Sequence, residues 1–115
     1  MRYINENLPS DSKILFFFMG KRGYYCDREY VPESQTMLSQ FIREGKTPED
    51  IFITYKAMKA THLLVQKEFF IKWANDVFNA GQIQILQNFM QSYLNLEFSA
   101  NGIDLFILKV RSDNG

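Results

Sequence analysis

The sequence is short of cysteine, histidine and proline, and these shortages exclude several classes of site. Cys26 is the only cysteine, so an internal disulfide framework and a thiolate zinc site are excluded. His62 is the only histidine, and metal-ligand spacing is absent, so we expect no metal and no cofactor. The three prolines and six glycines do not gather into a linker, and no internal repeat is present. A chain of 115 residues without such a boundary is expected to form one domain, residues 1–115.

An excess of one charge and a long hydrophobic run are both missing. Thirteen basic and thirteen acidic residues cancel, whereas nucleic-acid binders normally carry a basic excess, so we expect no nucleic-acid partner. The longest uninterrupted apolar run, Ile14–Met19, has six residues, against the ~20 that a membrane-spanning helix needs. The first seven residues lack the apolar core of a signal peptide. We therefore expect no membrane span in this chain, and expect any membrane anchor to lie outside it.

Aromatic residues are abundant by contrast. Eleven Phe, six Tyr and one Trp make up 16% of the chain, more than a domain of this size needs to fill one core. Two interpretations remain open from the sequence: a phenylalanine-rich core, or a surface on which some rings dock against a partner.

The spacing of apolar residues predicts strands and helices in the order β-αα-β-αα-β-β. The expected fold is an α/β domain with an open mixed, mostly parallel four-stranded sheet, a C-terminal antiparallel hairpin and flanking helices. A short helical turn at residues 2–7 leads in, and the segment from Gly20 to Pro32 is expected to be a loop. The strands are expected at 13–19, 61–65, 94–98 and 103–110, and the helices at 34–44, 48–58, 69–77 and 83–93.

Two local signals support this order. In Thr47-Pro48-Glu49-Asp50, the threonine can cap a helix, proline suits the first helical position, and the acids favour the positive helix end. These acids are therefore better explained as first-turn residues than as a glycosidase pair. Near the C-terminus, Asn101-Gly102 suits a tight hairpin turn, and the alternation of Leu94, Leu96 and Phe98 predicts a half-buried strand before it.

The best candidate for a ligand or docking site is the loop after the first strand. Open α/β sheets bind ligands beyond the carboxyl ends of their strands, where this loop would lie. Cations there could hold a phosphate and tyrosines could stack on a sugar, although the glycines match neither common phosphate-loop pattern. The alternative is a turn whose tyrosines pack on neighbouring helices and whose acid pairs with an arginine. The candidate residues are Lys21, Arg22, Tyr24, Tyr25, Asp27 and Arg28.

No catalytic residues are predicted. His62 with Cys26 is the only formal pairing of a base with a thiol nucleophile, and the sequence has no nucleophile elbow. A structural role for His62, inside an apolar strand, is therefore the favoured interpretation.

Two stretches carry a resemblance to a known family: residues 3–15, Tyr-Ile-Asn-Glu-Asn-Leu-Pro-Ser-Asp-Ser-Lys-Ile-Leu, and residues 22–28, Arg-Gly-Tyr-Tyr-Cys-Asp-Arg. The chain resembles the soluble C-terminal domain of polytopic membrane glycosyltransferases of the dolichyl-phosphate-mannose protein mannosyltransferase type. The segments Thr61–Val65 and Leu94–Leu108 also fit. Lys21 stands where a small or acidic residue is expected, and Cys26 replaces an aliphatic residue.

The resemblance implies a larger parent enzyme that transfers a sugar from a polyprenyl-phosphate donor. Its catalytic acid would lie near its first membrane spans, so no catalytic residue carries over to this chain. The implied partners are the transmembrane part of the parent and a polyprenyl-phosphate sugar or acceptor, and the implied location is the extracytoplasmic, periplasmic side. Two other functions stay open: a free-standing module that binds a sugar phosphate or nucleotide, and a protein-interaction domain.

Overall fold

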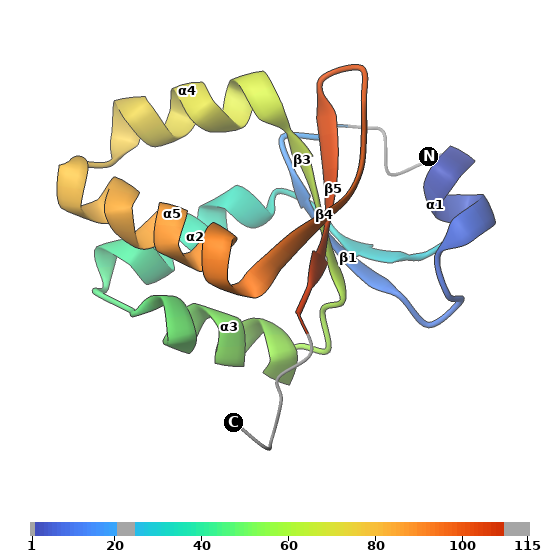
Figure 1. The fold of residues 1–115 in the computed structure, drawn as a ribbon, viewed down its shortest axis with the longest axis horizontal. Coiled ribbons are helices and arrows are strands. Elements are labelled where there is room, and N and C mark those ends of the chain that lie inside the picture. The colour runs from blue at the N-terminus through green and yellow to red at the C-terminus, as the bar shows by residue number, and fades with distance from the viewer. Residues whose placement is uncertain (1, 21–24, 110–115) are drawn as a thin grey trace.

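The structure, a computed structural model that describes residues 2–20 and 25–109, is built on one five-stranded mixed sheet (Figure 1). Among these residues no helix is both long and apolar enough to cross a membrane. The elements follow one another as α1 (Arg2–Asn7), β1 (Lys13–Phe17), β2 (Glu29–Val31), α2 (Ser34–Arg43), α3 (Pro48–Ala57), β3 (His62–Gln66), α4 (Lys67–Val77), α5 (Ala80–Tyr93), β4 (Leu94–Ala100) and β5 (Ile103–Leu108).

The strand order across the sheet is β2-β1-β3-β5-β4. β1 pairs in parallel with β2 and β3, whereas β5 pairs antiparallel with β3 and β4. The expected mixed α/β fold with a C-terminal hairpin is therefore confirmed, but the sheet is neither four-stranded nor mostly parallel. Glu29–Val31, in the segment expected to be a loop, forms the additional edge strand β2.

Both errors have a physical cause. β2 has only three residues, too few for an alternation of apolar and polar side chains to be visible in the sequence. The hairpin enters the sheet through β5, whose residues Ile-Asp-Leu-Phe-Ile-Leu suit an inner position. β4 carries Asn95, Glu97 and Ser99 and takes the exposed edge, where polar residues limit pairing with other chains. The helices α4 and α5 connect β3 to β4, and parallel pairing of these two strands was expected. Instead, β3 pairs antiparallel with β5.

Four helices cover one face of the sheet. Figure 1 shows α2, α3, α4 and α5 together on one side and the short α1 on the other. The core under the four helices includes Leu15, Phe17, Leu63 and Val65 from the sheet, packed with Tyr55, which is fully buried. This face holds most of the aromatic residues, so a phenylalanine-rich core accounts for much of the aromatic content.

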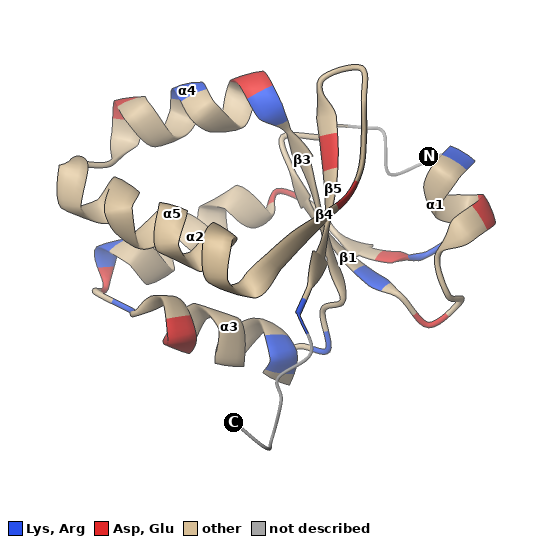
Figure 2. Cartoon of the chain, viewed as in Figure 1, with Lys and Arg blue, Asp and Glu red and all other residues tan. Residues whose placement is uncertain are grey.

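Helix capping explains where the helices begin. Thr47 Oγ1 accepts a hydrogen bond from the Asp50 N–H at 3.1 Å, and the Asp50 carboxylate accepts one from the Thr47 N–H at 3.3 Å, so the expected cap of α3 is confirmed. A second capping box, between Asn79 and Gln82, starts α5 and separates it from α4. Figure 2 shows charged residues along α3 and α4 but none on α5, whose exposed side carries amides.

A β-bulge in β4 corrects one further expectation. Leu96 pairs with Phe106 and Phe98 pairs with the adjacent Leu105, so Glu97 is an extra residue in the strand. The predicted alternation fails at this point: Leu94 is buried, but Leu96 is 58% and Phe98 40% exposed. As a result Glu97 and Phe98 both contact residues on the α1 side of the sheet.

Candidate functional site

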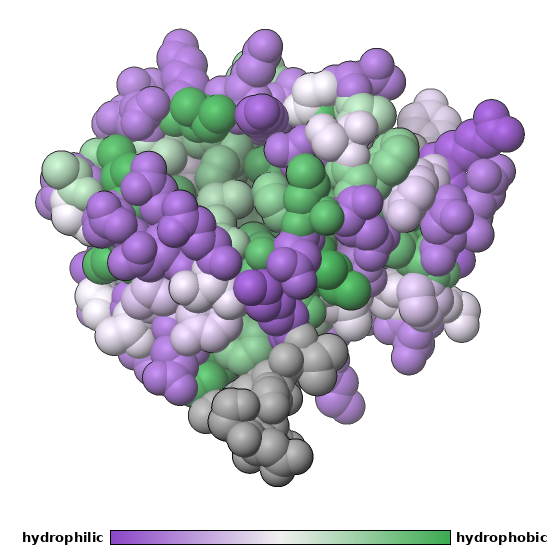
Figure 3. All heavy atoms as spheres, viewed as in Figure 1, coloured by the Kyte–Doolittle hydropathy of each residue, from purple (hydrophilic) through white to green (hydrophobic). Residues whose placement is uncertain are grey.

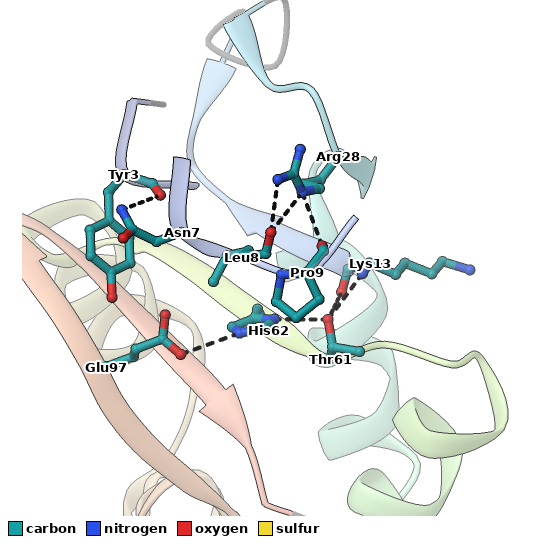
Figure 4. Close-up of polar contacts among 9 residues, drawn as sticks. All are labelled: Tyr3, Asn7, Leu8, Pro9, Lys13, Arg28, Thr61, His62 and Glu97. Atoms are coloured by element: carbon teal, nitrogen blue, oxygen red, sulfur yellow. Dashed lines mark hydrogen bonds and ion pairs between the residues drawn. The ribbon is translucent and has the colours of Figure 1, made fainter. Parts of the chain in front are cut away.

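The two stretches that carry the family resemblance meet in space, on the α1 side of the sheet. Asn5 of the first stretch donates from Nδ2 to the backbone oxygen of Tyr25 at 2.8 Å, and its Oδ1 accepts from the Asp27 N–H at 2.7 Å. Arg28 of the second stretch donates from Nη2 to the Leu8 oxygen at 2.7 Å and from Nε to the Pro9 oxygen at 3.0 Å. The two segments therefore interlock through reciprocal side-chain to backbone hydrogen bonds (Figure 4 shows the Arg28 half).

This arrangement assigns Arg28 a structural role. Its Nη2 also donates to the Asn5 oxygen at 3.1 Å, so the guanidinium binds carbonyl groups at the C-terminal end of α1. Those groups lack partners within the helix and carry partial negative charge, which a cation stabilises. The Arg28 side chain therefore holds α1 against the rest of the fold, and these hydrogen bonds compete with binding of a phosphate.

The remaining residues of the candidate loop have different outcomes. Lys21, Arg22 and Tyr24 lie outside the described residues. Tyr25 is 73% exposed, so its ring is not packed on a neighbouring helix. Asp27 makes its hydrogen bond to Asn5 through its backbone N–H. Ligand binding by this loop stays a prediction.

A groove lies beside the interlocked segments, between α1 and the β4–β5 hairpin. Its volume is about 590 Å³, which falls in the range of small-molecule sites. The floor is aliphatic and includes Leu64, Leu105 and Met19, and the polar lining includes Asn101 and the ion pair of Arg2 with Glu6. The groove therefore suits an amphipathic ligand better than a fully polar one.

Aromatic rings form the walls of this groove. Tyr3 on α1 and Phe98 on β4 stack with their ring centroids 4.1 Å apart and their planes 8° apart. Tyr25, from the candidate loop, also lines the groove. The exposed surfaces of Phe98 and Tyr25 supply flat apolar contact area at little entropic cost.

Behind the Tyr3–Phe98 wall lies a chain of polar contacts that links β1, β3 and β4 (Figure 4). His62 on β3 is 3% exposed, and its Nδ1 lies 2.8 Å from Thr61 Oγ1. Its Nε2 lies 3.5 Å from Glu97 Oε1 and has no hydrogen-bond partner within the described part of the chain. Thr61 continues the chain to β1, because its Oγ1 accepts from the Lys13 N–H at 3.0 Å and lies 3.1 Å from the Lys13 oxygen.

Burial and the Glu97 carboxylate act in opposite directions on the pKa of His62 and in the same direction on the pKa of Tyr3. Desolvation lowers the pKa of His62, and the neighbouring Glu97 carboxylate raises it but by less, so the net direction is downward. Desolvation raises the pKa of Tyr3, and the charge of the nearby Glu97 carboxylate raises it further. At neutral pH His62 is therefore uncharged and Tyr3 keeps its hydroxyl hydrogen.

The structure does not pair His62 with Cys26 as base and nucleophile. The Cys26 thiol lies 3.4 Å from the Arg28 oxygen, whereas His62 contacts Thr61 and Glu97. Asp50 is engaged in the α3 cap, as expected of a first-turn acid. Within residues 2–20 and 25–109, no group of three or more His, Cys, Asp and Glu side chains is arranged to hold a metal ion.

Sequence reasoning missed the groove because its residues come from four separate segments. Tyr3 and Phe98, which stack, are 95 positions apart, and the bulge that turns Phe98 toward Tyr3 has no signature in the sequence. One signal was available: a lone histidine in a buried apolar strand requires a polar partner. Glu97, between two apolar residues of a predicted strand, was a candidate for that partner.

A second hollow lies on the helical side of the sheet. Figure 3 shows hydrophobic side chains gathered between α4 and α5. This hollow has a volume of about 230 Å³ and is lined by residues including Ile71, Ile83 and Met90. It is smaller than the groove, and its described lining has fewer aromatic rings.

Comparison with known proteins gives no assignment: no family model matches the sequence, and no curated protein or solved structure matches it significantly. Inference about function therefore rests on the residues and their geometry.

Proposed function

We propose that this chain is a non-catalytic domain of an integral-membrane glycosyltransferase that uses a polyprenyl-phosphate-linked sugar, and that its α1–hairpin groove binds that donor or its acceptor. The observation that supports this most directly is the interlocking of residues 3–15 with residues 25–28, the described part of the second stretch. These stretches carry the resemblance, and Asn5 and Arg28 hold them together through hydrogen bonds to each other's backbone. The residues on which the resemblance rests thus contact one another within one part of the fold.

The chemistry of the groove also fits such a ligand. A polyprenyl-phosphate sugar combines an apolar chain, an anionic phosphate and a polar ring. The aliphatic floor at Leu64 and Leu105 suits the chain, and the ring faces of Phe98 and Tyr25 suit the sugar. Arg2, which forms an exposed ion pair with Glu6, has further N–H groups that can donate to the phosphate.

Binding can be tested with a water-soluble short-chain polyprenyl phosphate that bears a hexose. We expect backbone amide signals of groove residues in ¹⁵N-labelled protein to shift as this probe is added, and Phe98→Ser to weaken binding at least tenfold. Leu96→Ser is the matched control, because Leu96 is on the same strand and more exposed but does not line the groove. Unchanged spectra at saturating probe, or equal weakening by both substitutions, would contradict the assignment of the groove.

The link to a membrane enzyme is tested separately, with the full reading frame from which the sequence comes. We expect it to encode apolar membrane spans, and membranes containing its product to transfer sugar from a polyprenyl-phosphate donor. Purified residues 1–115 alone should transfer none. Transfer by the purified chain, or a reading frame that encodes this chain alone, would contradict the proposal.

A free-standing module that binds a sugar phosphate or nucleotide is the second candidate. The groove supports it, because a pocket of this volume with Arg2 and Asn101 at its rim does not require an attached membrane domain. Titration with a hexose 1-phosphate that lacks the polyprenyl chain separates the two, since binding as tight as that of the prenylated probe would favour the module.

A further inference from the structure

A buried histidine nitrogen that faces a carboxylate without bonding to it is an unusual feature of this fold. His62 Nε2 is inaccessible to solvent and lacks a partner among the described residues, although Glu97 Oε1 is only 3.5 Å away. Leaving a buried polar atom unpaired costs free energy, so such atoms call for an explanation.

Hydrogen counting shows which state of His62 would complete the contacts. The Thr61 hydroxyl has one hydrogen and two neighbouring acceptors, the Lys13 oxygen at 3.1 Å and His62 Nδ1 at 2.8 Å. If the hydroxyl donates to Lys13, Nδ1 must carry the histidine hydrogen, and Nε2 then presents a lone pair to the Glu97 carboxylate. If it donates to Nδ1, Nε2 carries the hydrogen and can donate to Glu97, while the Lys13 oxygen keeps the hydrogen bond from the Thr61 N–H at 2.8 Å. The doubly protonated ring keeps the bond from the Thr61 hydroxyl to Lys13 as well, and adds a positive charge that attracts the Glu97 carboxylate 3.5 Å away.

We propose that His62 and Glu97 form a proton-operated contact that orders the Tyr3 wall of the groove: when His62 takes up a proton, Nε2–H donates to Glu97 and draws this carboxylate inward. The Tyr3 hydroxyl points toward the same carboxylate (Figure 4), whose charge acts on it, and the Tyr3 ring stacks on Phe98. Protonation of one buried ring is thereby transmitted to the lining of the groove. That this regulates ligand binding rests on the proposed function, whereas the proton coupling itself does not.

The other ionisable groups around His62 leave Glu97 as its partner. Lys13 on β1 donates from Nζ to the Met58 oxygen at 3.0 Å, and its side chain extends away from the imidazole (Figure 4). Arg28 is held by carbonyl groups at the end of α1. On β5, the residue paired with His62 is Ile107, which does not ionise. From α1, Tyr3 reaches the network through Glu97.

The test is a titration of the whole chain by nuclear magnetic resonance between about pH 8 and about pH 5, the range in which histidine changes charge. His62 is the only histidine, so its ring signals need no assignment. We expect Glu97→Gln to lower the pH midpoint of His62, because the substitution removes the carboxylate that favours the charged ring while burial remains. Glu68→Gln, at an exposed carboxylate on α4, is the matched control and should leave the midpoint unchanged.

Whether protonation of His62 affects Tyr3 is measured with ¹³C-labelled tyrosine rings in the parent protein. Tyr3 ring signals should shift with the same midpoint as His62, while those of Tyr25, held to Asn5 only through its backbone, should not follow it. If the His62 midpoint is the same in the parent and in Glu97→Gln, the proposed His62–Glu97 contact is wrong. If the Tyr3 ring signals do not shift at the His62 midpoint, the contact does not affect the groove. If Glu97→Gln does not fold, the Tyr3 titration in the parent decides. No ligand is needed, so failure of the proposed function would leave this result intact.

Discussion

The two faces of the sheet are covered in different ways. On the helical face, four helices bury a core in which aromatic rings meet edge to face or stack, such as Phe17 with Phe70 and Phe52 with Tyr93. On the other face, the six-residue α1 covers a smaller apolar cluster and leaves the groove beside it. The buried His62 and its polar contacts belong to this second face.

The difference indicates a division of roles within one sheet. The helical face supplies most of the apolar burial and hence most of the stability. The α1 face depends on directed hydrogen bonds from Asn5 and Arg28, and combines exposed rings with a titratable pair. Substitutions should therefore affect the free energy of unfolding on one face and local structure, binding or pH response on the other.

The largest expected effect is on the helical face. Phe89 is 1% exposed, and its ring meets that of Tyr55 edge to face at 5.7 Å, so Phe89→Ala should lower the free energy of unfolding by about 3–5 kcal/mol. Phe98→Ala on the opposite face removes a ring that is 40% exposed and should cost at most about 1.5 kcal/mol. Urea denaturation followed by circular dichroism measures both, and equal losses would refute the division of roles.

Arg28→Ala should have the next largest effect, about 2–3 kcal/mol, because charge-assisted hydrogen bonds to Asn5, Leu8 and Pro9 are lost. Hydrogen exchange should accelerate in α1 more than in α3 or α5. Arg28→Lys should restore little, since an ammonium group cannot reproduce the forked contact. Arg2→Ala is the control: Arg2 forms an exposed ion pair with Glu6 at 3.2 Å, and its loss should cost under about 0.5 kcal/mol. Uniform acceleration of exchange would contradict a local role for Arg28.

Thr47→Ala should cost about 1 kcal/mol, because the Asp50 N–H loses its acceptor at the start of α3. Thr54→Ala, within the same helix, is the comparison. Thr54 donates to the Asp50 oxygen at 2.8 Å, a contact of little stabilising value, and alanine has the higher helix propensity. Denaturation midpoints that fall equally in the two variants would mean that the cap is not the cause.

Among these substitutions, His62→Gln should have the smallest effect on the free energy of unfolding at neutral pH. Its effect on the pH dependence of that free energy should be the most distinctive. The pKa of His62 is lowered in the folded state, so the unfolded chain binds a proton first as the pH falls below about 6.5. The parent should therefore lose stability between about pH 6.5 and the lower folded pKa. His62→Gln should show a flatter profile over this window. A variant profile parallel to that of the parent would mean that His62 does not titrate differently in the two states.

Much of the fold could be predicted because its signals are local. The apolar run of β1, the cap at Thr47 and the turn at Asn101-Gly102 each act through neighbouring residues, and each is present in the structure. The strand order could not be predicted, because no local signal determines that β5 rather than β4 pairs with β3. That choice depends on the relative polarity of two strands within the finished sheet.

The candidate site was predicted only in part, for the same reason. Tyr25, predicted as part of a ligand or docking loop, lines a groove that the sequence did not predict, and Arg28 of the same loop binds backbone carbonyl groups. The sequence shows that an arginine is present. It does not show whether its guanidinium already donates to backbone carbonyl groups of a segment about 20 positions earlier. The contribution of Glu97 depends on a bulge that turns one carboxylate toward β3.

The position of β5 has a consequence for the order in which the chain can fold as it is synthesised. β3 is an inner strand, and the edge that faces away from β1 is closed only by residues 103–108. Until the ribosome has released that segment, His62–Gln66 presents unpaired backbone groups and apolar side chains, a template on which other chains can aggregate. A nascent chain that has completed β1, α3 and α4 is therefore still an incomplete sheet. Folding of this domain must wait for its C-terminal hairpin to insert.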